Sequence, residues 1–200
     1  MITRESITGA ILCGGRGSRF AGRDKPLELL DGKPLVAYVH ERLAAQVASV
    51  VVSCNRNREV YARYADMVVV DAAADRGPLE GMLAAMAAAR TDYVFACPGD
   101  APFLSRGIVA RLAEALEREG SDVAVPHDGE QRQHLFLLAR RALAERIRSF
   151  LDDGGRAVHA FVDARSIAVV DMSDARATFV NVNTPGELAA LSATRNRNGA

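Results

Sequence analysis

Short apolar runs rich in β-branched residues alternate along this chain with longer segments in which apolar residues recur at helical spacing. Side chains repeat every second residue along a strand and about every 3.6 residues around a helix, so the two patterns predict strands and helices in turn. Strands are expected over 7–12, 50–54, 67–70, 93–96, 123–125, 131–138 and 167–170, and helices over 35–47, 79–89, 108–118, 143–151 and 188–193.

Several of the expected strands, such as 7–12 and 50–54, are nearly continuous apolar runs. Such runs are typical of strands buried on both faces, in a parallel sheet with helices on either side. We therefore expect a three-layer α/β/α sandwich around a Rossmann-like, mostly parallel sheet, in one domain over 1–194, and a tail, 195–200, whose composition predicts disorder. In such sheets ligands bind beyond the carboxyl ends of the strands.

The composition of the chain argues against a membrane protein, a secreted protein and a protein that binds nucleic acid through its net charge. The 200 residues are 49% hydrophobic, and 25 basic side chains balance 25 acidic ones. Because the net charge is close to zero, the electrostatic field of the whole protein is not expected to attract nucleic acid or an anionic membrane. No apolar run approaches the roughly 20 residues of a membrane span. The first residues lack the apolar core of a secretory signal, and no coiled-coil heptads occur, so a cytoplasmic monomer is expected. Cys13, Cys54 and Cys97 form no CxxC pair and are expected to be reduced, small apolar side chains.

The loop after the first expected strand combines glycines with cations. Three glycines lie within the four positions 14–17, and cations occupy positions 16, 19 and 25. Glycines let backbone N–H groups converge on phosphate oxygens without Cβ atoms in the way. A dinucleotide-binding fingerprint is excluded because Phe20 occupies the place of its third glycine, and a Walker A loop is excluded because no lysine follows Gly22 directly. The remaining alternatives are a phosphate cradle and a basic surface loop.

Polar side chains also follow later strands. Asn55 and Asp71 come after the second and third strands, where their oxygens could accept hydrogen bonds from guanine, or could instead form a turn and a loop cap. Asp100 follows the strand 93–96 between Gly99 and a proline-bounded turn. Because Mg²⁺ prefers one or two carboxylates plus phosphate oxygens, Asp100 is a candidate metal ligand.

The segment Gly77-Pro78-Leu79-Glu80-Gly81 opens the next helix. Proline suits the first turn of a helix, whereas a glycine inside one costs about 1 kcal/mol relative to alanine. That cost is tolerable if a ligand or a neighbouring backbone needs the room at Gly81.

These motifs resemble the nucleotidyltransferases that activate sugars and cofactors, which share a glycosyltransferase-A-like fold of the nucleotide-diphospho-sugar transferase type. The family pattern LxGGxxxR(M)xxxDK corresponds to residues 12–25, with Cys13 for the usual Ala and Phe20 for the usual Met. In the second half, 134–138, 150–158 and 179–188 are similar to the (H)PLFAL, FLxxGxRxV and NxNTPxDL elements of the molybdenum cofactor guanylyltransferases, with Leu135 in place of Pro. The chain is identified as a member of that family, the MobA family.

The resemblance implies that GMP is transferred from GTP to molybdenum-molybdopterin, giving the guanine dinucleotide cofactor and pyrophosphate, with Mg²⁺ as cofactor. It also implies a nucleotide-binding half over about 6–105, an acceptor-binding half over about 106–194, and transient contact with molybdoenzymes or their chaperones. Together with the strand ends, it predicts the catalytic residues Arg19, Lys25 and Asp100, with Asp100 on the metal, and the nucleotide-binding residues Leu12, Cys13, Gly14, Gly15, Lys25, Asn55, Asp71 and Asp100. Secondary candidates for the nucleotide or the acceptor are Gly77, Pro78, Leu79, Gly81, His134, Arg156, Asn181 and Asn183.

Some roles stay open in the sequence. His134 could be an edge-strand or core residue, Arg156 could lie over a helix surface rather than reach a phosphate, and Asn183 could belong to a helix-capping turn in which Thr184 caps the helix begun by Pro185. Alternatives for the whole protein are a molybdopterin cytidylyltransferase, a sugar-phosphate nucleotidyltransferase and a non-catalytic nucleotide-binding chaperone of molybdoenzymes.

Overall fold

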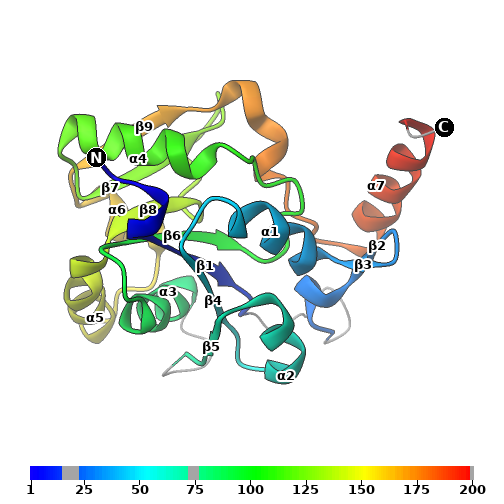
Figure 1. Cartoon of the computed structure of the whole chain (residues 1–200), viewed down its shortest axis with the longest axis horizontal. Helices are drawn as coiled ribbons and strands as arrows, with labels where there is room; N and C mark the ends of the chain where they lie inside the picture. Colours follow the sequence, from blue (N-terminus) through cyan, green and yellow to red (C-terminus); the bar gives the residue numbers. More distant parts are fainter. Residues whose placement is uncertain (15–22, 72–76, 199–200) are drawn as a thin grey trace.

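A seven-stranded sheet forms the centre of the molecule (Figure 1). The computed structural model describes residues 1–14, 23–71 and 77–198, and the strand order is β5-β4-β1-β6-β8-β7-β9. The strands are β1 (Ile7–Leu12), β4 (Ser49–Ser53), β5 (Met67–Val69), β6 (Tyr93–Pro98), β7 (Val123–His127), β8 (Leu137–Arg140) and β9 (Ile167–Asp171). Only β8 runs antiparallel to its neighbours within this sheet, so the expected mostly parallel sheet is confirmed.

Helices cover both faces of the sheet and complete the expected three layers (Figure 1). One face carries α1 (Leu35–Ala44), α4 (Ile108–Glu119) and the short α2 (Arg58–Tyr61), and the other carries α3 (Pro78–Ala88), α5 (Ala144–Asp152) and α6 (Val158–Asp163). Short 3₁₀ helices occupy Arg4–Ser6, Lys25–Leu27 (η3), Ala62–Tyr64, Arg141–Leu143 and Ser173–Phe179. Among the described residues, no helix has both the length and the apolarity needed to cross a membrane.

Close packing of α1 on the sheet depends on a glycine in β1. A Cβ atom added at Gly9 would lie 2.8 Å from Cδ2 of Leu43, which is fully buried on α1. The apolar face of α1, which also buries Val36 and Val39, therefore lies directly against the β1 backbone. A side chain larger than hydrogen at position 9 would push α1 away from the sheet.

A small apolar cluster attaches the end of the chain to β2 (Leu29–Leu30) and to the start of α1. Leu30 of β2, Leu35 and Val182 are fully buried together, and Leu188 and Leu191 of α7 (Pro185–Asn198) pack against them. Strand β2 forms a two-stranded hairpin with β3 (Lys33–Pro34), and α7 projects from the body of the molecule (Figure 1).

Three sequence expectations need correction. Helix α7 runs from Pro185 to Asn198 and is therefore longer than the helix expected over 188–193. The strand expected over 131–138 is confined to Leu137–Arg140, because a turn precedes it in which the Phe136 N–H donates to the Gln133 carbonyl. The four-residue α2 and six-residue α6 were not predicted, since such short segments show little helical periodicity.

The turn after β7 is built around a buried aspartate. Asp128 accepts hydrogen bonds from the backbone N–H groups of Gln131 and Glu130, both at 2.8 Å, and from the Gln133 amide at 2.6 Å. These bonds, the backbone ones foremost, lower the pKa of Asp128 from 3.8 to about 2. Because the folded pKa lies below the unfolded one, the charged carboxylate stabilises the fold above about pH 4, and this contribution is lost as the pH falls toward 2.

We therefore expect Asp128→Asn to lower the free energy of unfolding at neutral pH. The same variant should show a shallower loss of stability between about pH 4 and pH 2 than the unaltered protein. Urea unfolding measured across this pH range checks both effects, and equal pH slopes for the two proteins would contradict the assigned role.

Candidate functional site

The carboxyl ends of four parallel strands, β5, β4, β1 and β6, meet at one edge of the sheet. Backbone hydrogen bonds continue past the strands at this edge, from Cys13 N to the Ser53 carbonyl at 2.8 Å and from Gly99 N to the Leu12 carbonyl at 3.0 Å. Because Cys13, Gly14, Asn55, Asp71 and Asp100 each follow one of these strands closely, the fold brings their backbones together at this edge.

A lysine, an aspartate and an asparagine from distant parts of the sequence form the centre of this edge. The Lys25 ammonium makes an ion pair with the Asp100 carboxylate and donates a hydrogen bond to Asn183 Oδ1 at 2.9 Å. Asp100 is only 5% exposed, and its carbonyl accepts a hydrogen bond from Val182 N at 3.1 Å. The structure thus joins two of the predicted catalytic residues to a secondary candidate, while Arg19 and Gly15 lie outside the described residues.

Asn55 and Asp71 bind each other across the ends of β4 and β5. The Asn55 amide donates to Asp71 Oδ2 at 3.1 Å, and the Asp71 N–H donates back to Asn55 Oδ1 at 3.2 Å. The other carboxylate oxygen of Asp71 accepts a hydrogen bond from the Ser53 hydroxyl at 2.5 Å. These three bonds fix the orientation of the Asp71 carboxylate, which retains acceptor capacity for a ligand because its two oxygens offer about four lone-pair sites.

The start of α3 approaches Ser53 and Asp71 so closely that only glycine fits at position 81. A Cβ atom added at Gly81 would lie 2.8 Å from Ser53 Oγ and 3.2 Å from Asp71 Oδ1. Gly77 precedes the helix with φ +89°, and its added Cβ would lie 3.6 Å from the Arg156 carbonyl. The sequence predicted a need for room at Gly81, and the structure identifies a side-chain pair that needs it. Pro78 and Leu79 form the first turn of α3 beside this contact, with Leu79 fully buried.

We expect Gly81→Ala to destabilise the protein by about 1–3 kcal/mol, although alanine normally favours a helix interior by about 1 kcal/mol. The added methyl group must push the Ser53 hydroxyl away from Asp71, so nucleotide affinity should fall as well. Urea unfolding gives the sign directly, and a variant more stable than the unaltered protein would refute the expectation. Adding Ser53→Ala to Gly81→Ala removes the 2.8 Å contact and should recover part of the lost stability.

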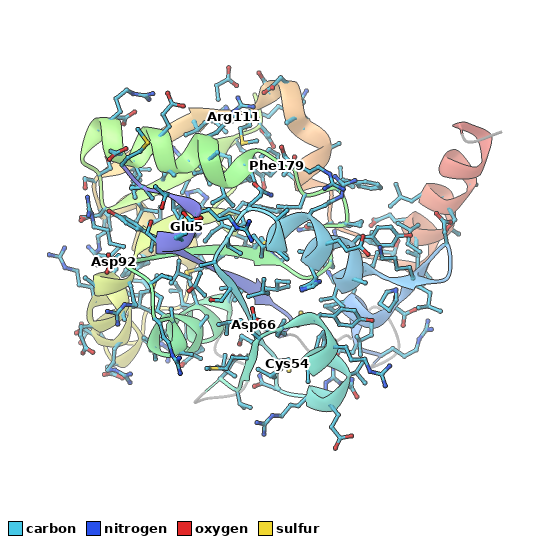
Figure 2. All side chains as sticks on the ribbon, viewed as in Figure 1. Glu5, Cys54, Asp66, Asp92, Arg111 and Phe179 are labelled. Carbon is cyan, nitrogen blue, oxygen red and sulfur yellow. The ribbon has the colours of Figure 1, made fainter. Side chains whose placement is uncertain are left out.

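Three buried thiols lie beneath the same edge. Cys13, Cys54 and Cys97 are all free and buried, as the sequence predicted, and Cys54 lies in the interior near α2 (Figure 2). Burial raises the pKa of Cys54 to about 11 and raises those of Cys13 and Cys97 well above the ordinary value. The thiolate forms are therefore scarce at neutral pH, which makes these cysteines packing residues rather than nucleophiles.

Cys13 also explains a glycine next to Asp100. A Cβ atom added at Gly99 would lie 2.5 Å from Cys13 Sγ and 3.2 Å from Pro26 Cβ. The loop that carries Asp100 therefore packs directly on Cys13 and on the segment that carries Lys25. Gly14, the residue after Cys13, lies close to Asp71, since its added Cβ would be 3.4 Å from Asp71 Oδ2.

The second-half candidates His134 and Arg156 make contacts of a different kind. His134 lies in the turn before β8, with Nε2 3.4 Å from Asp163 Oδ1 on α6. The Arg156 guanidinium donates to the Leu151 carbonyl at 2.7 Å, in the last turn of α5, and the same carbonyl accepts the Gly154 N–H at 3.1 Å. No contact described for either side chain joins it to Lys25 or Asp100 within the described ranges, although the Arg156 backbone borders the start of α3.

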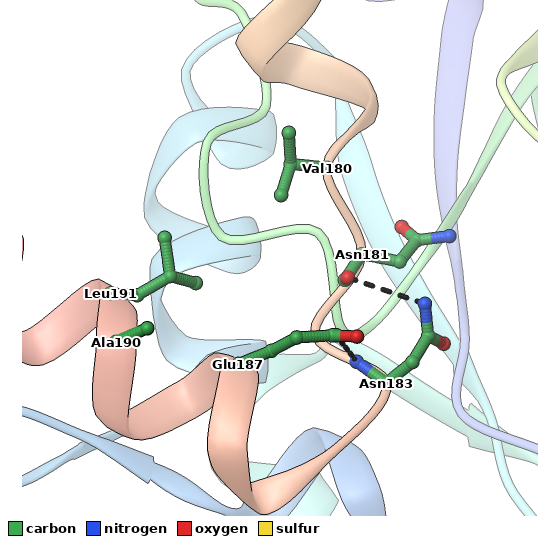
Figure 3. Close-up of a pocket in the computed structure, with 6 residues that line it drawn as sticks. All are labelled: Val180, Asn181, Asn183, Glu187, Ala190 and Leu191. Atoms are coloured by element: carbon green, nitrogen blue, oxygen red, sulfur yellow. Dashed lines mark hydrogen bonds between the residues drawn. The ribbon is translucent and has the colours of Figure 1, made fainter.

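A pocket of about 320 Å³ lies between the segment 180–183 and α7. It is lined by Val180, Asn181, Asn183, Glu187, Ala190 and Leu191 (Figure 3). The two asparagines lie on no strand, contrary to the expected alternation, yet both line this pocket.

Hydrogen bonds hold one wall of this pocket and leave one polar atom unpaired. The Asn183 N–H donates to Glu187 Oε2 at 2.7 Å, and Thr184 Oγ1 accepts the Glu187 N–H at 3.2 Å, so the expected cap of α7 is present. Asn181 Oδ1 is buried without a hydrogen-bond partner among the residues that the structure describes. Buried polar atoms are nearly always paired, so an unpaired oxygen at this position is unusual.

The sequence profile of the MobA-like NTP transferase domain matches residues 9–170, which include the carboxyl ends of β1, β4, β5 and β6. The chain belongs to this family. Among its relatives are the molybdenum cofactor guanylyltransferases of Cupriavidus necator, 40% identical over 194 residues (94% of this chain and 97% of that protein), and of Shewanella amazonensis, 38% identical over 187 residues (93% and 95%). The crystal structure of molybdopterin-guanine dinucleotide biosynthesis protein A from Archaeoglobus fulgidus has the same fold, with a TM-score of 0.79 at 21% identity, covering 95% of this chain and 99% of that one.

Two members of the site in this MobA-like chain were not predicted. Ser53 orients Asp71, and Glu187 holds the Asn183 backbone. A hydroxyl at the end of an otherwise apolar strand and a glutamate three residues after a helix-capping threonine are the signals that could have indicated them.

Proposed function

We propose that this chain transfers GMP from GTP to molybdenum-molybdopterin, which forms the molybdopterin guanine dinucleotide cofactor and releases pyrophosphate. Relatives of nearly equal length that are 38–40% identical carry the name molybdenum cofactor guanylyltransferase. The observation that carries the proposal is the contact of Lys25 with Asp100 and Asn183, because it brings a cation and a buried carboxylate together where the nucleotide loop of the family ends.

In the proposed reaction, an oxygen of the acceptor phosphate attacks the α-phosphorus of GTP in line. The new bond joins that oxygen to the α-phosphorus as the bond from the α-phosphorus to the bridging oxygen breaks, and pyrophosphate carries away the electron pair. The acceptor phosphate is already ionised at neutral pH, so no strong base is required. The protein acts by holding both substrates in place, with Lys25 and backbone N–H groups neutralising charge that develops on the triphosphate.

Mg²⁺ is the proposed cofactor, and Asp100 is its proposed ligand. No three His, Cys, Asp or Glu side chains in the described part of the chain are placed to hold a metal ion together. A single buried carboxylate beside the amide of Asn183 suits Mg²⁺, which takes one or two carboxylates and completes its shell with phosphate oxygens and water. When bound, the ion would supply further neutralisation of the triphosphate charge.

We assign the guanine base and the acceptor to different places around Lys25 and Asp100. We assign guanine to the side of Asp71, because guanine N1–H and N2–H₂ are donors and the Asp71 carboxylate is an oriented acceptor. We assign the acceptor to the pocket of Figure 3, where the unpaired Asn181 oxygen could accept a pterin N–H and Asn183 borders both the pocket and Lys25. Action as a cytoplasmic monomer, transient contact with molybdoenzymes, and independence from nucleic acid and membrane are part of the same proposal.

Pyrophosphate release tests this function with purified protein, Mg²⁺ and molybdenum-loaded molybdopterin, comparing GTP with CTP in parallel. Release with GTP and not with CTP is the expected result. Release with CTP alone would instead make the chain a cytidylyltransferase, and GTP binding without any release would favour the chaperone alternative.

A further inference from the structure

Asp24 lies directly before Lys25. At the start of a helix, an aspartate carboxylate usually accepts hydrogen bonds from the first backbone N–H groups, but the Asp24 carboxylate does not. Asp24 occupies the N-cap position of η3, and its carbonyl accepts the Leu27 N–H at 2.9 Å, but its side chain makes no capping hydrogen bond. Instead, Asp24 Oδ2 accepts a hydrogen bond from the Asn57 amide at 3.0 Å. The side chain is therefore turned away from its own helix toward the loop that follows β4.

Asn57, which makes this contact with Asp24, has an uncommon backbone conformation. Its φ of 52° is left-handed, and Asp31 is the only other non-glycine residue with positive φ among those described. Its carbonyl starts α2 by accepting the N–H groups of Val60 at 2.9 Å and Tyr61 at 3.1 Å. Asparagine tolerates this conformation at modest cost, and the conformation directs the amide toward Asp24.

Tyr61 lies next to Asp24 in the protein interior. Its side chain is fully buried, and its hydroxyl lies beside Asp24 and Cys13 without a well-formed hydrogen bond in the described structure. Burial, with the Asp24 carboxylate nearby, raises the pKa of Tyr61 far above its ordinary value, so the hydroxyl stays neutral. On the opposite side, Pro26 packs at the Gly99 backbone, next to Asp100. The short segment that carries Lys25 is thus held at both ends.

We propose that Asp24 and Asn57 are positioning residues for Lys25. Their hydrogen bond fixes the segment 24–27 so that the Lys25 ammonium is held at Asp100 and Asn183, where the triphosphate is to bind. Helix α2 then has a role that its four residues do not suggest, since it presents Asn57 and Tyr61 to Asp24. This inference rests on the proposed function for its effect on catalysis, but not for its effect on the position of Lys25.

Asn57→Gly tests the contact without disturbing the backbone. Glycine adopts the left-handed conformation readily and keeps the carbonyl that starts α2, so the substitution removes only the amide that binds Asp24. Misplacement of a reacting group by about 1 Å can cost up to about 10²-fold in rate, so we expect kcat to fall about tenfold. In a Lys25→Ala background the same substitution should cause less than about a twofold further loss, because the residue to be positioned is absent. A merely structural role would lower activity by the same factor in both backgrounds, and that result would overturn the proposal.

The position of Lys25 can also be measured without the reaction. The chain contains only two lysines, so in a Lys33→Arg background Lys25 carries the sole side-chain amine. Its rate of acetylation by acetic anhydride, read by mass spectrometry against the N-terminal amine, should rise severalfold in Asn57→Gly as the ammonium is released from Asp100. Glu59→Ala, on the exposed side of α2, is the matched control and should change neither kcat nor labelling. Unchanged labelling in a folded Asn57→Gly protein would overturn the proposal, whereas altered labelling in a chain without guanylyltransferase activity would leave it standing and refute the proposed function alone.

Discussion

Asp100→Ala is expected to lower kcat by at least about 10²- to 10³-fold, the usual cost of removing one preorganised electrostatic group from an active site. The variant removes both the proposed metal ligand and the counter-ion of Lys25, while the backbone bond from Val182 N to the Asp100 carbonyl can remain. Pyrophosphate release at increasing Mg²⁺ concentration is the measurement. Because the metal site is weakened, the apparent affinity for Mg²⁺ should fall together with kcat.

A matched control for Asp100 lies at the opposite end of the same strand. Asp92 precedes β6 and is exposed (Figure 2). Asp100 follows β6 and is buried. Asp92→Ala should therefore retain nearly full turnover. Near-normal turnover of Asp100→Ala at saturating Mg²⁺ would refute the role given to this carboxylate.

Lys25→Met should also lower kcat by about 10²- to 10³-fold, because the methionine side chain keeps most of the length of lysine but carries no charge to place on the triphosphate. The loss should persist at any Mg²⁺ concentration, which distinguishes it from the loss in Asp100→Ala. Single-turnover pyrophosphate release at saturating GTP separates the chemical step from binding.

The chain provides one natural control for Lys25. Lys33, its only other lysine, pairs with Glu41 and lies 4.4 Å from the centre of the Tyr38 ring. Lys33→Met removes the same charge at a place where no substrate is proposed to bind, so its turnover should stay within about twofold of the unaltered protein. A large loss in Lys33→Met and none in Lys25→Met would reverse the assignment of the phosphate-contacting lysine.

Local pattern was sufficient for much of the fold. Apolar runs such as 7–12 and 93–96 predicted strands that the structure contains, and their continuity predicted a parallel sheet between helices. The pattern was insufficient where a segment is short or its partners are distant. Strand β8 is antiparallel and begins only after a turn, and α2 and α6 are too short to show a helical period. In these places pairing with the rest of the fold decides the structure.

The site divides in the same way. Lys25, Asp71 and Asp100 could be singled out because a charged residue directly after an apolar strand or a glycine-rich loop is unusual, and this signal is local. Asn183 could also be named as a candidate from the sequence, but its contact with Lys25, from near the end of the chain, could not be predicted. Neither could the contact of Ser53 with Asp71, which follows the neighbouring strand.

The sequence alone therefore determined the layers of the fold, the motif family and the residue types that could bind phosphate and a metal ion, because each depends on short-range spacing and on the periodicity of strands and helices. Only the tertiary structure decided which of these side chains touch, which glycines are sterically required, and that Asn57 binds the residue before Lys25. Contacts of this kind join strand ends that adjoin only once the sheet has assembled, so the spacing of residues along the chain carries no record of them.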